Sequence, residues 1–149
     1  MTNKYEFVPG DEITIAPGRT VKRIRALVAI ATFGVAAGDV GGYVENVENL
    51  SQVSGNAWVS GNARVYGDAW VYGDARVSGN AQIVWFSKVG RDNGTLTVFK
   101  DKDGQLIATR GCFIGTIDEF LSKSEAEHDD KTHLEYRLLI EVAYSRLTK

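Results

Sequence analysis

A six-residue motif repeats without interruption over residues 53–82 of this chain. Each copy reads Val-x-Gly-(Asn/Asp)-Ala-x, and Ile83 opens the next period. A fixed period constrains the fold more strongly than composition does, because every copy must build the same local structure and pack on its neighbours. The valine and the alanine return in the same phase, so both must face one interior. The repeat therefore predicts a parallel β-helix.

The other positions of the motif suit the corners and strands of such a coil. Glycine followed by Asn or Asp tolerates a tight bend or a positive φ, and the branched valine packs well in a short strand. A glycine in every copy excludes an α-helix, and solenoids built on five- or nine-residue motifs do not match this period. Known hexapeptide-repeat proteins fold three hexads into each left-handed coil. On that precedent we expect a short left-handed parallel β-helix.

The stacking of the coils determines which side chains are neighbours. If three hexads make one coil, each hexad lies about 4.8 Å from the third hexad after it. This register pairs Trp58 with Arg76 on the outside, as a cation–π contact. Valine and alanine already fill the interior, so the outward aromatic and arginine side chains favour a surface for a partner. The candidate binding residues are Trp58, Arg64, Tyr66, Trp70, Tyr72 and Arg76.

Segments of different composition flank the repeat. Residues 1–46 form a β-rich lead-in, with turn signals at Pro9-Gly10 and Pro17-Gly18. Residues 47–84 carry the β-helix, and residues 85–149 form a C-terminal α+β module. The predicted class is therefore mainly β, with a short β-helix between a β-rich lead-in and a βββαα module.

The C-terminal module carries both strand and helix signals. Runs at 83–86, 95–99 and 105–109 predict three strands of a meander, because Asn-Gly and Asp-Gly turns separate them. Helices are expected to begin at Thr116 and Thr132, since each precedes a glutamate at capping-box spacing. An apolar stripe of helical period then runs through the last helix. Its members are Leu134, Tyr136, Leu138, Ile140, Val142 and Leu147.

Charge and cysteine content narrow the class of partner and the compartment. The net charge of -2 argues against a general polyanion binder, and we interpret the basic residues within 19–25 as the solvated face of a strand. The single cysteine, Cys112, cannot form an internal disulfide, which favours a reducing cytosol. The N-terminus lacks the apolar core of a signal peptide, and the apolar run at 27–38 is too short to span a bilayer. We expect a cytoplasmic protein that binds neither membranes nor nucleic acid.

Several segments carry a resemblance to a known family. Residues 18–27, 38–45 and 48–51, running into the hexads, resemble the YdcK-like hexapeptide-repeat proteins of enterobacterial genomes, prophages and phages. The tail, at 85–90, 94–99 and 111–120, is similar to a C-terminal module of phage proteins of this type. The resemblance implies the left-handed β-helix. By analogy with other left-handed hexapeptide proteins, it also implies a homotrimer with its coils side by side.

Proteins with this fold are often labelled acyltransferases on the fold alone. The residues that such an enzyme needs can be compared with those in this chain. Hexapeptide acyltransferases use a histidine as general base, within reach of an acceptor and of acyl-CoA lying along the coil. The repeat contains no histidine, and His133 lies near the helical end. A Cys112 nucleophile with His133 as its base is a second catalytic hypothesis, although Cys112 beside Phe113 is typical of a small buried cysteine. The cysteine and the histidines lack metal-ligand spacing, so neither a metal nor a cofactor is expected.

These observations favour binding over catalysis. We expect a non-catalytic, oligomeric protein encoded by a phage or prophage, acting in counter-defence by blocking a host protein or by sequestering a nucleotide signal. Arginine beside aromatic rings suits an anionic planar ligand, through phosphate contacts and stacking. The alternative is an acyl-CoA-dependent acyltransferase, in which His133 of one subunit reaches the coil of another.

Overall fold

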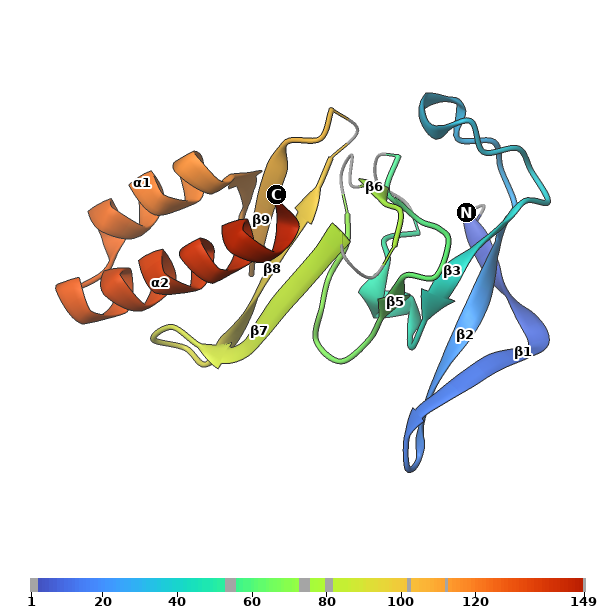
Figure 1. Cartoon of the computed structure of the whole chain (residues 1–149), viewed down its shortest axis with the longest axis horizontal. Helices are drawn as coiled ribbons and strands as arrows, with labels where there is room; N and C mark the ends of the chain where they lie inside the picture. Colours follow the sequence, from blue (N-terminus) through green and yellow to red (C-terminus); the bar gives the residue numbers. More distant parts are fainter. Residues whose placement is uncertain are drawn as a thin grey trace.

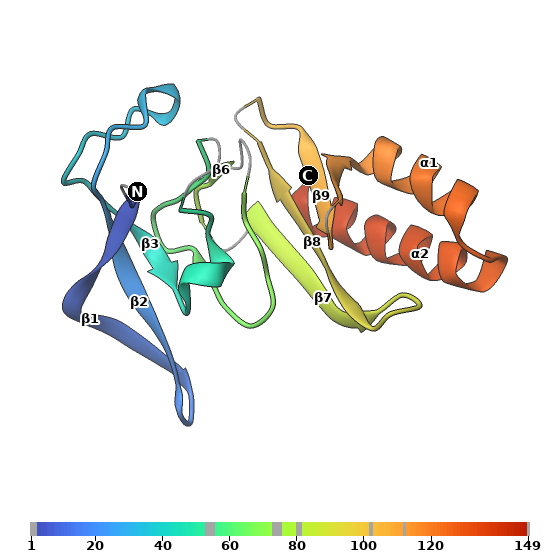
Figure 2. The same cartoon turned by 180° about the vertical axis from the view of Figure 1, so that it is seen from behind.

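The structure, a computed structural model, describes residues 3–52, 56–72, 76–79, 82–101, 103–111 and 113–148. It is mainly β-structure, with two helices at the C-terminal end (Figure 1). Three parts follow one another along the longest axis: an N-terminal sheet, the repeat segment, and a C-terminal sheet with the helices on its far side (Figures 1 and 2). The repeat segment is therefore covered on two sides by the rest of the chain.

The lead-in forms a sheet that continues onto the repeat. Its strands are β1 (Tyr5–Ala16), β2 (Arg19–Ala26) and β3 (Val40–Val44), and short 3₁₀ turns follow at Ala31–Phe33 and Val47–Asn49. β1, β2 and β3 pair antiparallel, and β3 then pairs in parallel with β5 (Arg64–Val65) of the repeat. Gly18 has a φ of 73°, so the turn between β1 and β2 uses the left-handed conformation that glycine adopts freely. The lead-in and the repeat thus share one sheet.

Buried polar contacts tie the start of the lead-in to the repeat segment. Lys4 is only 6% exposed, and its Nζ donates a hydrogen bond to the carbonyl oxygen of Ala57 at 2.7 Å. Desolvation by burial lowers the pKa of Lys4 to about 8. The Tyr5 hydroxyl donates to the carbonyl oxygen of Leu50 at 2.8 Å, and burial, with the charge of Glu48, raises the Tyr5 pKa. Both side chains therefore stabilise the fold, because their polar atoms donate hydrogen bonds to backbone carbonyl oxygens.

The repeat segment contains strand pairs at the spacing that the hexads predict. β4 (Trp58–Val59) runs parallel to β6 (Arg76–Val77), with Trp58 opposite Arg76. The two residues occupy equivalent positions three hexads apart. The predicted pairing register of Trp58 with Arg76 is therefore confirmed.

The interior of the repeat segment follows the predicted phase. Each described valine and alanine of the motif is at most 1% exposed, and these residues form one cluster with β2, β3 and part of the C-terminal sheet. The prediction that valine and alanine face one interior is confirmed at these positions. They are Ala57, Val59, Ala63, Val65, Ala69, Val71 and Val77.

The described residues form separate sheets and not one continuous β-helix. β4 and β6 make a two-stranded sheet, whereas β5 belongs to the sheet of the lead-in. The reason is the length of the strands: each spans two residues, and turns take up much of the motif, as at Gly61 and Gly67 with φ of 63° and 65°. β5 pairs in parallel with β3, and Leu50 likewise forms a parallel bridge with Val71.

The C-terminal module is an antiparallel meander in sequence order. Its strands are β7 (Ile83–Val89), β8 (Gly94–Lys100), β9 (Leu106–Arg110) and β10 (Phe113–Thr116). The three predicted strands are confirmed, with the antiparallel pairing that the turns indicate. β10 was missed because it is short and contains a glycine, Gly115, which weakens a strand signal. The described module is therefore ββββαα.

Two helices, α1 (Ile117–Glu127) and α2 (Asp130–Leu147), end the chain. The capping box at Thr116 is confirmed, since its side chain accepts from the Glu119 amide at 3.1 Å and the Glu119 carboxylate accepts from the Thr116 amide at 2.8 Å. The predicted start at Thr132 is wrong, because Asp129 caps α2 and accepts from the Thr132 amide at 2.9 Å. Aspartate is an equally strong cap, and it lies earlier in the chain.

The C-terminal sheet has an apolar layer on each face. Leu96 and Val98 of β8 pack against the helices, whereas Phe99 joins the core of the repeat segment. This alternation is the period of a strand buried on both faces. The stripe predicted for α2 is divided: Tyr136, Ile140 and Leu147 are buried, and Leu134, Leu138 and Val142 are about half exposed on the other side of the helix. Neither described helix is long and apolar enough to cross a membrane.

Candidate functional site

The basic residues of the lead-in are paired within the chain. The side chains of Arg19 and Glu45 lie 3.1 Å apart, and those of Arg25 and Glu6 lie 2.6 Å apart. Arg19 and Arg25 therefore each have an acidic neighbour, which reduces their attraction for a phosphate backbone, and Lys22 lies over the Phe7 ring at 5.3 Å from its centroid.

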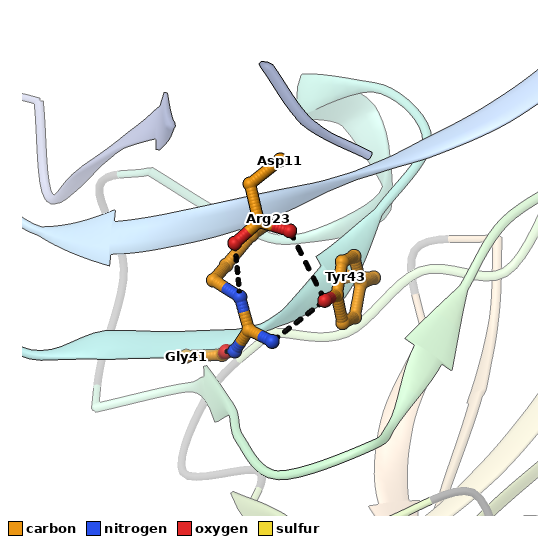
Figure 3. Close-up of polar contacts among 4 residues, drawn as sticks. All are labelled: Asp11, Arg23, Gly41 and Tyr43. Atoms are coloured by element: carbon orange, nitrogen blue, oxygen red, sulfur yellow. Dashed lines mark hydrogen bonds and ion pairs between the residues drawn. The ribbon is translucent and has the colours of Figure 1, made fainter. Parts of the chain in front are cut away.

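Arg23 is the centre of the most connected of these pairs. Its Nε donates to Asp11 at 2.7 Å, its Nη1 to the carbonyl oxygen of Gly41 at 2.8 Å, and its Nη2 to the Tyr43 hydroxyl at 2.6 Å (Figure 3). Burial alone would lower the pKa of Arg23, but the hydrogen bonds to Asp11 and Tyr43 outweigh it and raise the pKa. This network holds the three N-terminal strands together, so it is structural.

Trp58 and Arg76 do not form the outward pair that the repeat predicts. Trp58 is 3% exposed and belongs to the core, so the expected outward position is wrong. Gly41 of β3 makes this possible, because a Cβ there would lie 2.8 Å from the indole. Arg76 stacks instead over Phe33, at 5.5 Å from its ring centroid. The lead-in thus covers the tryptophan and supplies another aromatic partner for the arginine.

Trp70 and Tyr72 lie where the repeat meets the C-terminal sheet. Their rings are 4.2 Å apart, and the Tyr72 hydroxyl donates to the carbonyl oxygen of Phe113 at 2.8 Å. The backbone of Trp70 accepts a hydrogen bond from Thr109 at 3.3 Å. The Trp70 ring is 42% exposed beside a hollow that Glu48 and Asp68 also line. These carboxylates do not suit an anionic ligand, and the pair serves mainly to join the two parts.

Arg64 and Tyr66 are brought together in one open groove, which we call the Arg64–Arg146 groove. It has a volume of about 620 Å³ and lies between the lead-in hairpin, the repeat and the C-terminal module. Arg64 comes from β5, Tyr66 follows it, and Arg146 projects from the last turn of α2. The described lining contains two arginines and no carboxylate. It consists of Thr14, Ile15, Arg64, Tyr66, Ile83, Val84, Trp85 and Arg146.

An aromatic pair forms one wall of this groove. Tyr66 and Trp85 meet edge to face, with ring centroids 4.8 Å apart and an interplanar angle of 85°. Both side chains are half-buried, so each is held in place while part of its ring reaches the groove. Guanidinium groups bind phosphate or carboxylate with paired hydrogen bonds, and aromatic rings stack on planar ligands. The groove therefore combines the two chemistries expected of the candidate residues.

Sequence reasoning named only Arg64 and Tyr66 among the eight described residues that line this groove. Thr14, Trp85 and Arg146 lie far from the hexads or just beyond them, and the folding of the chain brings them to Arg64 and Tyr66. Trp85 had a local signal, since an aromatic residue directly follows the point where the period stops. Arg146 had none, because an arginine in the last turn of a helix is ordinary.

The catalytic candidate His133 lies away from this groove. His133 Nδ1 is 3.0 Å from the Ser124 hydroxyl, and its Nε2 is 3.9 Å from Glu125, so its neighbours come from the facing helix. The helices cover the face of the C-terminal sheet away from the repeat (Figures 1 and 2). Cys112 falls outside the described residues. Within the described ranges, no three histidine, cysteine or acidic side chains gather as a metal site would require.

The fold and the groove define a mainly β repeat protein with an α+β extension and an anion-compatible, aromatic-walled groove. The family model of the YdcK β-solenoid repeat matches this chain at residues 57–73 and 69–83. The chain therefore carries a YdcK-like repeat, as the sequence indicates. No curated protein and no solved structure matches the chain.

Proposed function

We propose that this chain is a non-catalytic binding protein whose Arg64–Arg146 groove captures an anionic ligand with a planar ring, of the nucleotide type. One observation carries the proposal: two guanidinium groups and a crossed aromatic pair line the same groove, with no carboxylate among its described lining residues. Phosphate groups would bind Arg64 and Arg146, and a base would lie against Tyr66 or Trp85.

The expected strength of such a complex follows from these contacts. Two charge-assisted contacts and one stacked ring contribute roughly 4–9 kcal/mol before the cost of association. Because that cost is several kcal/mol, a dissociation constant in the micromolar range or weaker is expected. The groove is open, so salt competes for the arginines and affinity falls as ionic strength rises.

The biological setting of the proposal rests on the resemblance. We propose a phage- or prophage-encoded protein that sequesters a nucleotide signal in counter-defence, with left-handed coils packed as a homotrimer. The two-stranded sheet β4–β6 supports self-association, because a ladder that has no third strand among the described residues gains from a neighbouring coil.

Isothermal titration calorimetry with ADP, ADP-ribose and cyclic di-AMP tests the proposal, with acetyl-CoA included for the acyltransferase alternative. Arg146→Gln is expected to weaken nucleotide binding about tenfold, since it removes one charge-assisted contact. Arg137→Gln is the matched control, because Arg137 is exposed on the same helix and does not line the groove. Nucleotide binding that is equally unaffected by both changes would reject the groove as the binding site, and no nucleotide binding at all would reject the nucleotide ligand and favour a protein partner.

A further inference from the structure

We infer that a second pocket, between the helices and the C-terminal sheet, binds a small aromatic carboxylic acid. This His128 pocket has a volume of about 160 Å³ and is lined by Arg110, Phe113, Phe120, Lys123, His128 and Tyr136 among others. A cavity of about 150 Å³ with apolar walls accommodates benzene, so the size fits one ring. None of the pocket's described lining residues belongs to the Arg64–Arg146 groove.

An unsatisfied polar atom is the first observation behind this inference. Nδ1 of His128 is buried and has no hydrogen-bond partner among the described residues. A buried ring nitrogen without a partner costs free energy, and such groups are commonly satisfied by a bound molecule. The imidazole packs at 5.5 Å from the Tyr136 ring and lines the pocket. Because this nitrogen is closed to solvent, a small rotation of the imidazole would be needed to present it to a ligand oxygen in the pocket, which would supply the missing partner.

A guanidinium group and a hydroxyl group provide the other polar contacts. Nε of Arg110 donates to the Tyr136 hydroxyl at 2.9 Å, so the hydroxyl proton is available to a further acceptor. The Arg110 guanidinium lies over Gly94, where a Cβ would come within 2.4 Å of its Cζ. Gly94 therefore leaves the space that the guanidinium occupies. Guanidinium, hydroxyl and imidazole together match the oxygen atoms of one carboxylate.

The remaining walls favour a ring over a bare anion. Phe113 and Phe120 lie 5.7 Å apart, and Phe120 meets Tyr136 edge to face at 5.0 Å. These rings offer faces and edges to another aromatic group, which prefers tilted or offset contacts. The acidic side chains that line the pocket, Asp92 and Glu127, are exposed, and Glu127 lies 3.4 Å from Lys123. Asp92 and Glu127 therefore repel the carboxylate of the ligand less than Arg110 attracts it.

Side-chain NMR of the intact protein labelled with ¹⁵N-histidine tests the inference, with benzoate as the probe. The His128 ring resonances are expected to shift and saturate, by more than those of His133, which contacts the pocket only through Ser124. Acetate and benzyl alcohol, which lack the ring and the acid respectively, are expected to bind at least about tenfold more weakly. Equal shifts with acetate and benzoate, or no saturable shift with benzoate, would overturn the inference.

Substitutions distinguish ligand binding from a structural role of the same residues. Arg110→Lys keeps the charge but loses the planar fork, and should weaken benzoate binding about tenfold. Gly94→Ala displaces the guanidinium without changing Arg110 itself, and should also weaken benzoate, so the test survives if the lysine variant fails to fold. Arg137→Lys, on the exposed side of α2, is the matched control and should leave benzoate binding unchanged. Wild-type benzoate affinity in folded Arg110→Lys or Gly94→Ala would contradict the pocket.

Discussion

Replacing Gly41 with alanine adds one methyl group where β3 lies against the repeat segment. The new Cβ would stand 2.5 Å from the carbonyl oxygen of Val59, 2.8 Å from the indole of Trp58 and 2.9 Å from Ile24. All three neighbours belong to the buried core, and the nearest is a backbone atom of β4. None is the free end of a flexible side chain. The methyl group therefore forces the lead-in away from the repeat.

The size of the effect comes from two opposing contributions. The φ of Gly41 lies outside the left-handed region, so alanine suits the backbone and gains about 0.4–1 kcal/mol by restricting the unfolded chain. Overpacking a well-packed core costs about 1–3 kcal/mol, and a rigid backbone neighbour places this site at the upper end. The net loss in the free energy of unfolding is about 2 kcal/mol. For a domain of this length, that corresponds to a fall in Tm of roughly 4–8 °C.

Urea unfolding, followed by tryptophan fluorescence and circular dichroism, measures this loss. Gly94→Ala is the matched comparison, since its Cβ approaches an atom just as closely, 2.4 Å from the Arg110 guanidinium. An arginine tip can swing away, so that variant should lose less than about 1 kcal/mol. If Gly41→Ala stayed within about 0.5 kcal/mol of the wild type, the packing of Trp58 under β3 would be wrong.

Three further predictions follow from the described contacts. The free energy of unfolding should rise between pH 8 and 9.5 in the wild type but not in Lys4→Met. The Lys4 pKa is about 8 in the folded chain and near 10.5 in the unfolded chain, so the unfolded chain keeps its proton to higher pH. Urea titrations at each pH measure this difference. Asp129→Ala should cost about 1 kcal/mol by removing the cap of α2, whereas Thr132→Ala should be nearly neutral, as thermal unfolding would show. Ala69→Glu should abolish soluble protein, because a carboxylate would enter a position that is 1% exposed. A variant that is folded and unchanged would contradict the prediction that the alanines face the interior of the repeat.

The period predicted the interior of the repeat because each copy has valine and alanine at the same two positions. Valine and alanine return in one phase, and any fold with this period must bury them together, which is what the described positions show. The capping box at Thr116 was predictable for the same reason, since its partners lie within one helical turn. At the next helix, Asp129 and Thr132 are both good caps, and local sequence does not choose between them.

The outward positions of the hexads were not predictable from the repeat alone. Trp58 and Trp70 occupy the same place in their hexads, yet one is 3% exposed and the other 42% exposed. The difference comes from β3, which covers Trp58 through Gly41 and leaves Trp70 uncovered. The groove has the same origin, because Arg146 comes to line it with Arg64 only after α2 has packed on the C-terminal sheet. Contacts between segments that are distant in the sequence determine how exposed these side chains are, and the period carries no information about such contacts.

The most direct test of the proposed groove uses the three tryptophans as separate reporters. Protein labelled with 5-fluorotryptophan should give a fluorine resonance for Trp58 in the core, Trp70 beside the acidic hollow and Trp85 in the groove. During titration with ADP, the Trp85 resonance is expected to shift and saturate, while those of Trp58 and Trp70 stay unchanged. A saturable shift of Trp70 with no change at Trp85 would contradict the proposed groove.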